Sequence, residues 1–306
     1  MLPRRCSFGC RDCVRRDALA APVALRSPEM PPVTLPLILI ILASGACAGC
    51  LGSMLGLGGG VFLVPLLNLA LGFPLRTAAA ISLCTVIATS SSVSAGRAGD
   101  RLVNLRLGMV LEVATVAGSL LGGLTVHLFT EAALQRLFGA VTILTAIAVL
   151  SRIHRRNVMF DPSAQPGLLG GRFLDEESGG MVTYRVTRWP VALLASFAAG
   201  NVSSLLGVGG GILKVPALNT WCGVPVRAAA ATSAFMIGVT ATGGAIIYYG
   251  RGDLPPLLAA PAVLGVQLGS WVGLRLAGRV SARWLKALLS AVLVIVTALM
   301  FVRSMK

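Results

Sequence analysis

The sequence predicts an all-α polytopic membrane protein: two inverted-topology repeats with Gly-broken or re-entrant helices, about eight to ten membrane segments in all. Its composition, a duplicated Gly-rich motif and the charges of equivalent loops carry this prediction. Of the 306 residues, 56% are hydrophobic and only 12% charged, and the mean hydropathy is +0.84. Because a soluble domain has about a quarter of its residues charged, a soluble enzyme, a secreted disulfide module and a disordered scaffold are excluded.

Apolar segments follow one another along the whole chain. About twenty apolar residues suffice to cross a bilayer core as a helix. The predicted segments are roughly 34–54, 61–72, 77–96, 107–128 and 137–151 in the first half, and 189–205, 212–222, 228–249, 255–274 and 285–302 in the second. The second segment of each half is too short to span as a helix, which predicts a re-entrant or broken helix.

The two halves are copies of one unit. Leu-Gly-Leu-Gly-Gly-Gly-Val-Phe-Leu-Val-Pro begins at Leu55 and returns as Leu-Gly-Val-Gly-Gly-Gly-Ile-Leu-Lys-Val-Pro at Leu206, an offset of 151 residues. At that offset more than half of the positions between Gly49 and Ser82 are identical to their counterparts. The predicted organisation is a basic leader at 1–33, a first repeat at 34–151, a polar cytoplasmic linker at 152–188 and a second repeat at 189–306.

The leader is rich in arginine and contains Cys6, Cys10 and Cys13. This spacing is that of iron–sulfur ligands, but no fourth ligand follows it. A disordered tail, or a translation start at Met30, is the favoured interpretation. We predict no metal site and no cofactor, and keep a metal-ion carrier that uses these cysteines as a third hypothesis.

Equivalent loops differ in charge. The loop 97–106 carries three arginines and one acid, whereas in 248–257 one arginine is cancelled by one aspartate. The loop 126–135 has no arginine or lysine, but 277–286 has three basic residues. Since arginine and lysine gather in cytoplasmic loops, the two repeats are predicted to have opposite orientations. The net charge of +15 follows from such loops and the leader, and does not indicate nucleic-acid binding.

The two Gly-rich breaks are predicted to form one anion site. Glycines let a ligand approach the backbone closely, and the short helix after each break presents its positive end there. Two such ends would meet near the midplane. Alternatively, the glycines only allow close helix packing. The glycines are Gly58, Gly59, Gly60, Gly209, Gly210 and Gly211.

Polar residues near the breaks extend this candidate site. Lys214, whose counterpart is Leu63, either pairs with a substrate anion or snorkels to an interface. Ser82 and Thr85 belong to a hydroxyl stripe that either binds an oxyanion or joins helices. The further substrate-binding candidates are Asn68, Asn219 and Ser233, where the asparagines either cap or pair across the axis.

Three charged residues are candidates for gating or coupling. Arg76 and Arg227 each follow a Gly-x-Pro turn and either gate an entrance or anchor at headgroups. Glu112 is a candidate proton carrier, but lies only six residues after Arg106, which equally allows an interfacial role.

These features resemble the TauE/SafE family (TSUP) of sulfite exporters. The resemblance rests on the duplicated Gly-x-Gly-Gly-Gly-x-x-x-Val-Pro element and the following Gly-x-Pro-x-Arg-x-Ala-Ala-Ala, and covers about 34–303. It implies a membrane carrier for sulfur-containing anions such as sulfite, sulfonates or sulfoacetate, working without ATP hydrolysis. The family signature then falls on Gly58–Gly60, Pro65, Gly209–Gly211 and Pro216.

The predicted function is a secondary transporter, most simply an exporter, of small sulfur-containing anions by alternating access, in the inner (plasma) membrane. Both proton coupling and uniport fit. No enzyme is predicted, because Walker A, His-Glu-x-x-His and Gly-x-Ser-x-Gly motifs do not occur. The alternative is a non-transporting membrane assembly or scaffold factor. Expected partners are a small anion and the lipid bilayer, with a homodimer as an option and no nucleic acid.

Overall fold

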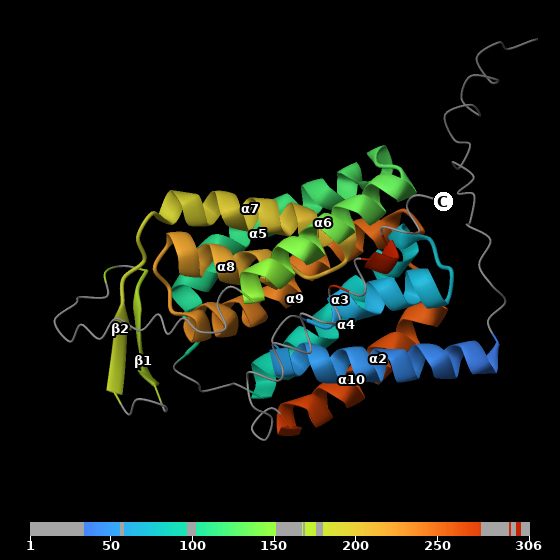
Figure 1. Ribbon diagram of the computed structural model, residues 1–306, viewed down its shortest axis with the longest axis horizontal. Coiled ribbons are helices and arrows are strands. Elements are labelled where there is room, and N and C mark those ends of the chain that lie inside the picture. The colour runs from blue at the N-terminus through green and yellow to red at the C-terminus, as the bar shows by residue number, and fades with distance from the viewer. Residues whose placement is uncertain are drawn as a thin grey trace, which may run out of the picture. The chain divides into compact units, whose positions relative to one another are not determined.

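The computed structural model describes residues 34–55, 58–96, 102–150, 167, 169–175, 180–276, 294 and 298–300. The predicted leader, its cysteines and much of the linker lie outside these residues. The chain divides into units Met1–Met30 and Pro31–Lys306, and every described residue belongs to the second, whose helices are shown in Figure 1.

The described helices reproduce the order of the predicted apolar segments as far as 255–274, and the last predicted segment, 285–302, lies mostly outside the described residues. The first half forms α2 (Leu35–Leu55), α3 (Gly60–Pro65), the π-helical turn η1 (Leu66–Ala70), α4 (Leu75–Gly96), α5 (Leu105–Thr125), the 3₁₀ turn η2 (Val126–Leu128) and α6 (Glu131–Leu150). The second forms α7 (Trp189–Leu206), α8 (Gly211–Trp221), α9 (Val226–Gly250) and α10 (Pro256–Leu276). Between the halves lie β1 (Gly171–Asp175) and β2 (Gly180–Tyr184).

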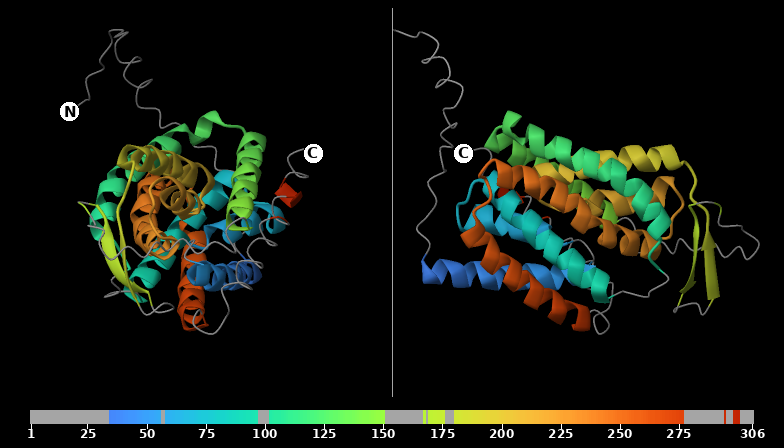
Figure 2. Two further views of the ribbon diagram at one scale, coloured as in Figure 1. Left: turned by 60° about the vertical axis from the view of Figure 1, so that its left-hand side comes forward. Right: turned by 180° about the vertical axis from the view of Figure 1, so that it is seen from behind.

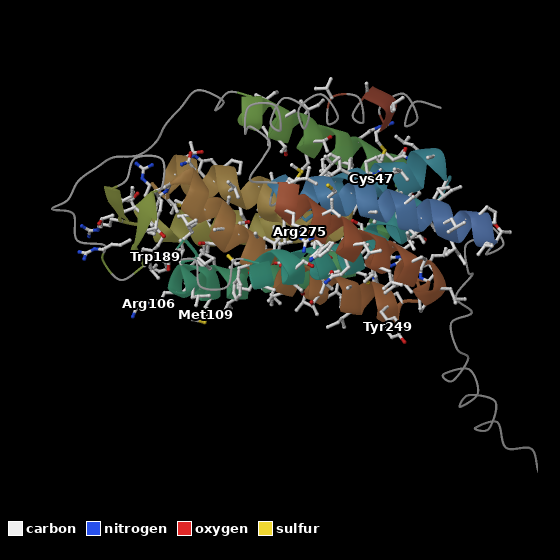
Figure 3. The ribbon with its side chains drawn as sticks, turned by 90° about the horizontal axis from the view of Figure 1, so that it is seen from below. Cys47, Arg106, Met109, Trp189, Tyr249 and Arg275 are labelled. Carbon is white, nitrogen blue, oxygen red and sulfur yellow. The ribbon has the colours of Figure 1, made fainter. Side chains whose placement is uncertain are left out.

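Six of the described helices are long and apolar enough to cross a membrane. Their spans are Leu35–Met54, Leu75–Gly96, Leu105–Leu128, Trp189–Leu206, Ala228–Gly250 and Pro256–Leu276. Exposed Trp189 lies near the end where the hairpin lies, and exposed Tyr249 near the other end (Figure 3), as amphipathic rings do at the two membrane interfaces. The predicted all-α polytopic membrane class is confirmed.

Proline and glycine keep the two broken segments short. Pro65 lies inside α3 and Pro216 inside α8, and proline provides no N–H for the helical ladder. After Pro65 the chain continues as the π-helical turn, a form seen where the regular ladder is interrupted. The segments end before Gly72 and Gly223, which have φ values of 72° and 71°, the left-handed conformation that glycine adopts readily.

Asn68 and Asn219 close these turns in the same way. The side-chain amide of Asn68 donates to the carbonyl of Phe73 at 2.7 Å, and that of Asn219 to the carbonyl of Val224 at 2.9 Å. Phe73 and Val224 are themselves counterparts at the 151-residue offset. Each asparagine thus stabilises the turn after its own broken helix. Of the two roles considered for these residues, capping and pairing across the axis, this contact is the capping one.

The two halves are joined by two close helix pairs, each made of one helix from each half. Helix α2 lies along α10, and α7 lies along α5 (Figures 1 and 2). A Cβ added to Gly118 would lie 2.0 Å from the Phe197 carbonyl oxygen, and one added to Gly269 would lie 1.9 Å from that of Ala46. These two contacts are equivalent at the 151-residue offset. The backbones approach so closely only because both positions are glycine.

Helices α4 and α9 cross near the centre of the bundle and run antiparallel. Leu83 contacts the later Gly244, whereas Ser90 donates to the carbonyl of the earlier Ala234 at 2.7 Å. In Figure 1, α2 runs toward the end where the hairpin lies, whereas its counterpart α7 starts at that end. In these two pairs of equivalent helices, α2 with α7 and α4 with α9, the members run in opposite directions.

Part of the predicted linker is folded. Strands β1 and β2 pair antiparallel, with Phe173 opposite Val182. Phe173, Val182 and Tyr184 are buried against residues that include Leu107 of α5 and Leu218 of α8. The hairpin thus packs on one end of α5 and of helices of the second half, which a reading of 152–188 as polar loop did not anticipate.

Asn104 connects this hairpin to α5. Its side-chain oxygen accepts from Leu107 N at 3.1 Å and caps the helix, while its amide donates to the Leu169 carbonyl at 2.9 Å and to the Tyr184 hydroxyl at 3.1 Å. Burial raises the pKa of the Tyr184 phenol.

We expect Asn104→Ala to lower the free energy of unfolding by about 1–2 kcal/mol, because it removes a helix cap and two further hydrogen bonds. Asn104→Asp keeps the cap oxygen and should lose less. Thermal unfolding in detergent measures both, with Ser91→Ala as a control, since exposed Ser91 bonds only to its own helix. Equal stability of Asn104→Ala and Ser91→Ala would contradict this role.

Candidate functional site

The two Gly-rich breaks meet at the crossing of α4 and α9. Gly58 and Gly209 have φ values of 82° and 72°, and a Cβ on either would lie between 3.0 and 3.4 Å from both Val86 and Ile237. Gly58 and Gly209 are counterparts, as are Val86 and Ile237. The elements predicted to form one central site are therefore brought together.

The space beside this crossing is small. A cavity of about 10 Å³ is lined by Gly58, Thr89, Ser90, Val93, Ala234 and Ile237. That is about the volume that one water molecule requires. The structure is therefore closed at the crossing, and an anion larger than water could enter only if the helices separate.

Hydroxyl groups of the two halves face the third glycine of each break. Ser82 donates to the Gly207 carbonyl at 2.6 Å, and a Cβ on Gly60 would lie 2.6 Å from the Ser82 hydroxyl oxygen. Ser233 is the counterpart of Ser82, and its hydroxyl oxygen would lie 3.2 Å from a Cβ on Gly211. The counterpart of Gly207 is Gly56, outside the described residues.

The rest of the hydroxyl stripe bonds within its own helix. Thr85 donates to the Ser82 carbonyl at 2.7 Å, and Thr89 to the Thr85 carbonyl at 2.8 Å. In this closed structure Ser82 alone of these three connects two helices. The lone pairs of these hydroxyls remain acceptors, so an oxyanion would require them to rotate.

Lys214 lies inside the bundle, not at an interface. It is only 1% exposed, and its Cε lies 3.6 Å from the position that a Cβ on Gly210 would occupy. Its ammonium lies 3.5 Å from Glu112 Oε2 and 3.3 Å from the Thr240 hydroxyl. The interfacial interpretation of Lys214 is therefore wrong, because the side chain points across the bundle toward α5 and α9.

Glu112 and Thr240 complete this polar cluster. The Thr240 hydroxyl lies 2.7 Å from Glu112 Oε1, and the Thr240 carbonyl accepts from Ser119 at 2.7 Å. Glu112 therefore contacts α8 and α9 from α5, although its place near Arg106 also allowed an interfacial role. An ion pair of this kind is stable in a membrane only if each charge has a partner.

Glu112 also borders a groove on the lateral surface between α5 and α9. The groove has a volume of about 610 Å³, and its lining includes Gly108, Glu112, Val116, Phe235 and Met236. Met109, which also lines it, lies on the outer surface in Figure 3. The Glu112 side chain is 13% exposed, whereas that of Lys214 is 0% exposed. The carboxylate is thus the accessible member of the pair.

Arg76 lies away from this cluster. Its guanidinium donates to the Phe129 carbonyl at 2.7 Å, in the turn between α5 and α6. Nearby, Glu131 accepts from Leu75 N at 2.9 Å at the start of α4. Arg76 is therefore bonded to a connecting turn, and the side chain of Arg227 is not among those described.

Sequence reasoning named Lys214 and Glu112 separately and missed their pairing, in which Thr240 takes part. A signal for the pairing exists in the repeat. The counterpart of Lys214 is Leu63 and that of Glu112 is Val263, while Thr240 matches Thr89. The two charges are thus additions to a shared apolar framework, one in each half. Such additions are expected in pairs, since each would be costly alone in a membrane.

Comparisons with known proteins agree with this architecture. A family model described as "Sulfite exporter TauE/SafE" matches residues 41–300. The chain is 26% identical over 264 residues to "Probable membrane transporter protein YunE" of Bacillus subtilis, covering 84% of this chain and 94% of that protein.

Two further relatives carry similar names. "Probable membrane transporter protein MJ0441" of Methanocaldococcus jannaschii is 26% identical over 274 residues, covering 85% of this chain and 92% of the relative. "Probable membrane transporter protein YdhB" of Bacillus subtilis is 23% identical over 237 residues, covering 78% and 87%. No solved structure matches. The match over most of the chain and the six apolar helices together mean that this multi-pass membrane protein belongs to the TauE/SafE family.

Proposed function

We propose that the protein is a secondary transporter that exports small sulfur-containing anions, such as sulfite or short organosulfonates, across the inner (plasma) membrane. The observation that carries the proposal is the meeting of the two Gly-rich breaks at one crossing, with a buried lysine beside the second break. Broken helices from two repeats are a common means of building a transport site near the midplane.

An anion fits the chemistry of this region. Gly210 precedes α8, and backbone N–H groups at the start of a helix attract negative charge. Lys214, in the first turn of α8, adds a full positive charge close to Gly210. The neighbouring helices carry Ser82, Thr85 and Ser233. The hydroxyl groups of these residues can donate hydrogen bonds to a sulfonyl oxygen of the anion.

Alternating access accounts for the closed crossing. Equivalent helices run antiparallel. Helix α2 of the first half packs against α10 of the second, and α7 of the second half packs against α5 of the first, which supports an inverted repeat. Rocking of one half against the other would open the crossing of Val86 and Ile237 first to one side and then to the other. On this proposal the linker and the hairpin lie on the cytoplasmic side, as the loop charges favour.

Flux into proteoliposomes tests the proposal. Purified full-length protein should give saturable uptake of radiolabelled sulfite, of a short sulfonate, or of both, and each should compete with the other. Empty liposomes and a bulky organic cation are the controls. Folded protein that moves neither anion would overturn the transport proposal and favour a membrane assembly factor.

A further inference from the structure

We propose that Glu112 and Lys214 form the coupling device of this transporter, in which a proton on Glu112 frees Lys214 to bind the anion. The inference rests on the proposed transport function and adds to it a coupling ion, a stoichiometry and the residue that carries the proton. It follows from how the pair is held, from what can reach each member, and from the balance of charge.

The pair is held unequally. The 2.7 Å bond between Thr240 and Glu112 is short and strong, whereas the contacts of the Lys214 ammonium at 3.5 Å and 3.3 Å are long. The carboxylate is thus fixed to α9, while the ammonium is loosely attached to it. Lys214 can change partner with little loss of hydrogen bonding, and Glu112 stays in place when it does.

Charge balance makes proton and anion binding cooperative. While Glu112 is ionised, it neutralises Lys214, and it would repel an anion placed beside the ammonium. When a proton forms an O–H bond with Glu112, the positive charge of Lys214 loses its partner, which is costly in a membrane. An anion at the ammonium restores the balance. Release reverses both steps, so one proton and one anion cross together, and net export runs only while the outward gradient of the anion exceeds the inward gradient of protons.

The two ligands have separate routes. Glu112 borders the lateral groove and is partly exposed, whereas Lys214 is enclosed and lies beside Gly210. Glu112 is seven residues after Leu105, the start of α5, which corresponds to about 10 Å along the helix. A proton can thus reach the carboxylate from the groove, while the anion arrives through the crossing of the breaks.

No other charge competes in the part of the chain that the structure describes. The only charged group that acts on Glu112 there is Lys214, and the only one that acts on Lys214 is Glu112. In the described part of α7 no side chain is ionisable, and on α9 Tyr248 and Tyr249 lie near one end of the helix and Arg227 lies near the other. The counterparts Leu63 and Val263 carry no charge, so one half alone would supply the coupling.

The test uses a short sulfonate, because a sulfonate has no titratable proton of its own. In proteoliposomes of wild-type protein, sulfonate uptake should carry about one proton per anion, followed by a pH dye, and an inward proton gradient should accelerate it. Glu112→Gln mimics the protonated acid. It should keep sulfonate uptake down its own gradient, lose the response to pH and move no protons. His127→Gln, which breaks the His127–Asp253 pair at 3.1 Å, is the matched control and should behave as wild type.

Two outcomes would overturn the inference while leaving transport intact. In one, Glu112→Gln still moves protons with the sulfonate at the wild-type ratio. In the other, the wild-type protein takes up the sulfonate without moving protons. A wild type that moves neither sulfonate nor sulfite would instead overturn the proposed function, and the inference with it. If Glu112→Gln does not fold, proton uptake by wild-type protein in detergent on adding the sulfonate replaces it: about one proton per bound anion supports the coupling, and none overturns it.

Discussion

Lys214→Met is expected to abolish anion transport and to lower the free energy of unfolding by about 3 kcal/mol. Methionine fills a similar volume, but it leaves the Glu112 carboxylate with Thr240 as its remaining partner. Removing one member of a buried ion pair costs about 3–5 kcal/mol, and the lower end applies because Glu112 also reaches the lateral groove. Transport is lost because the charge beside Gly210 is gone.

The double variant Lys214→Met, Glu112→Gln separates stability from transport. Replacing both charges leaves no unpaired ion, and such replacements are often neutral or stabilising. Stability should therefore return to near the wild-type value, while transport stays absent. Unfolding in detergent and sulfite flux measure the two properties on the same preparations. Transport by Lys214→Met at the wild-type rate would remove Lys214 from the site.

Gly118→Leu and Gly269→Leu are each expected to prevent the bundle from closing. Even a Cβ at these positions would lie 2.0 Å and 1.9 Å from a carbonyl oxygen of the neighbouring helix, so α5 and α7, or α10 and α2, would have to move apart. Overpacking costs about 1–3 kcal/mol in soluble cores and sometimes more. Here the obstacle is backbone, which cannot rotate away, so we expect little folded protein from either variant.

Smaller substitutions at the same two glycines should have a smaller effect on stability. Gly118→Ala and Gly269→Ala should each lower the free energy of unfolding by at least about 2 kcal/mol, and by similar amounts, because the two contacts are repeat equivalents. Gly250→Ala is the matched control: no atom lies within 4 Å of the added Cβ, and helix propensity favours alanine by about 0.5–1 kcal/mol. Size-exclusion profiles and unfolding in detergent measure both. A Gly118→Ala protein as stable as Gly250→Ala would refute the close-packing role.

On the proposed function, the closed crossing would let one site serve the two sides of the membrane in turn. Val86 and Ile237 lie against both Gly58 and Gly209, so a movement that opens one break must also move the helix that lines the other. Because each of α4 and α9 contacts both breaks, the two halves cannot change independently. Coupled opening of this kind is what an alternating carrier requires.

The sequence by itself determined the features that depend on local chemistry. Hydropathy and length predicted about eight to ten membrane segments, which include the six spans found in the described residues, since the bilayer thickness sets how many residues a helix needs. Pro65 interrupts the helical ladder of α3 and Pro216 that of α8. The broken segments end before Gly72 and Gly223. The duplication, readable at one fixed offset, predicted that the two breaks would be equivalent.

The tertiary structure alone decided which distant residues meet. Lys214 and Glu112 are 102 residues apart, and their pairing depends on how α5, α8 and α9 pack. The same is true of the hairpin, whose strands gain a hydrophobic partner only against Leu107 and Leu218, and of Arg76, which reaches Phe129 in another turn. Local patterns determine where a membrane helix begins, bends and ends. Which of its faces meets a charge is determined by helix packing, because the interactions that fix it join segments remote in the chain.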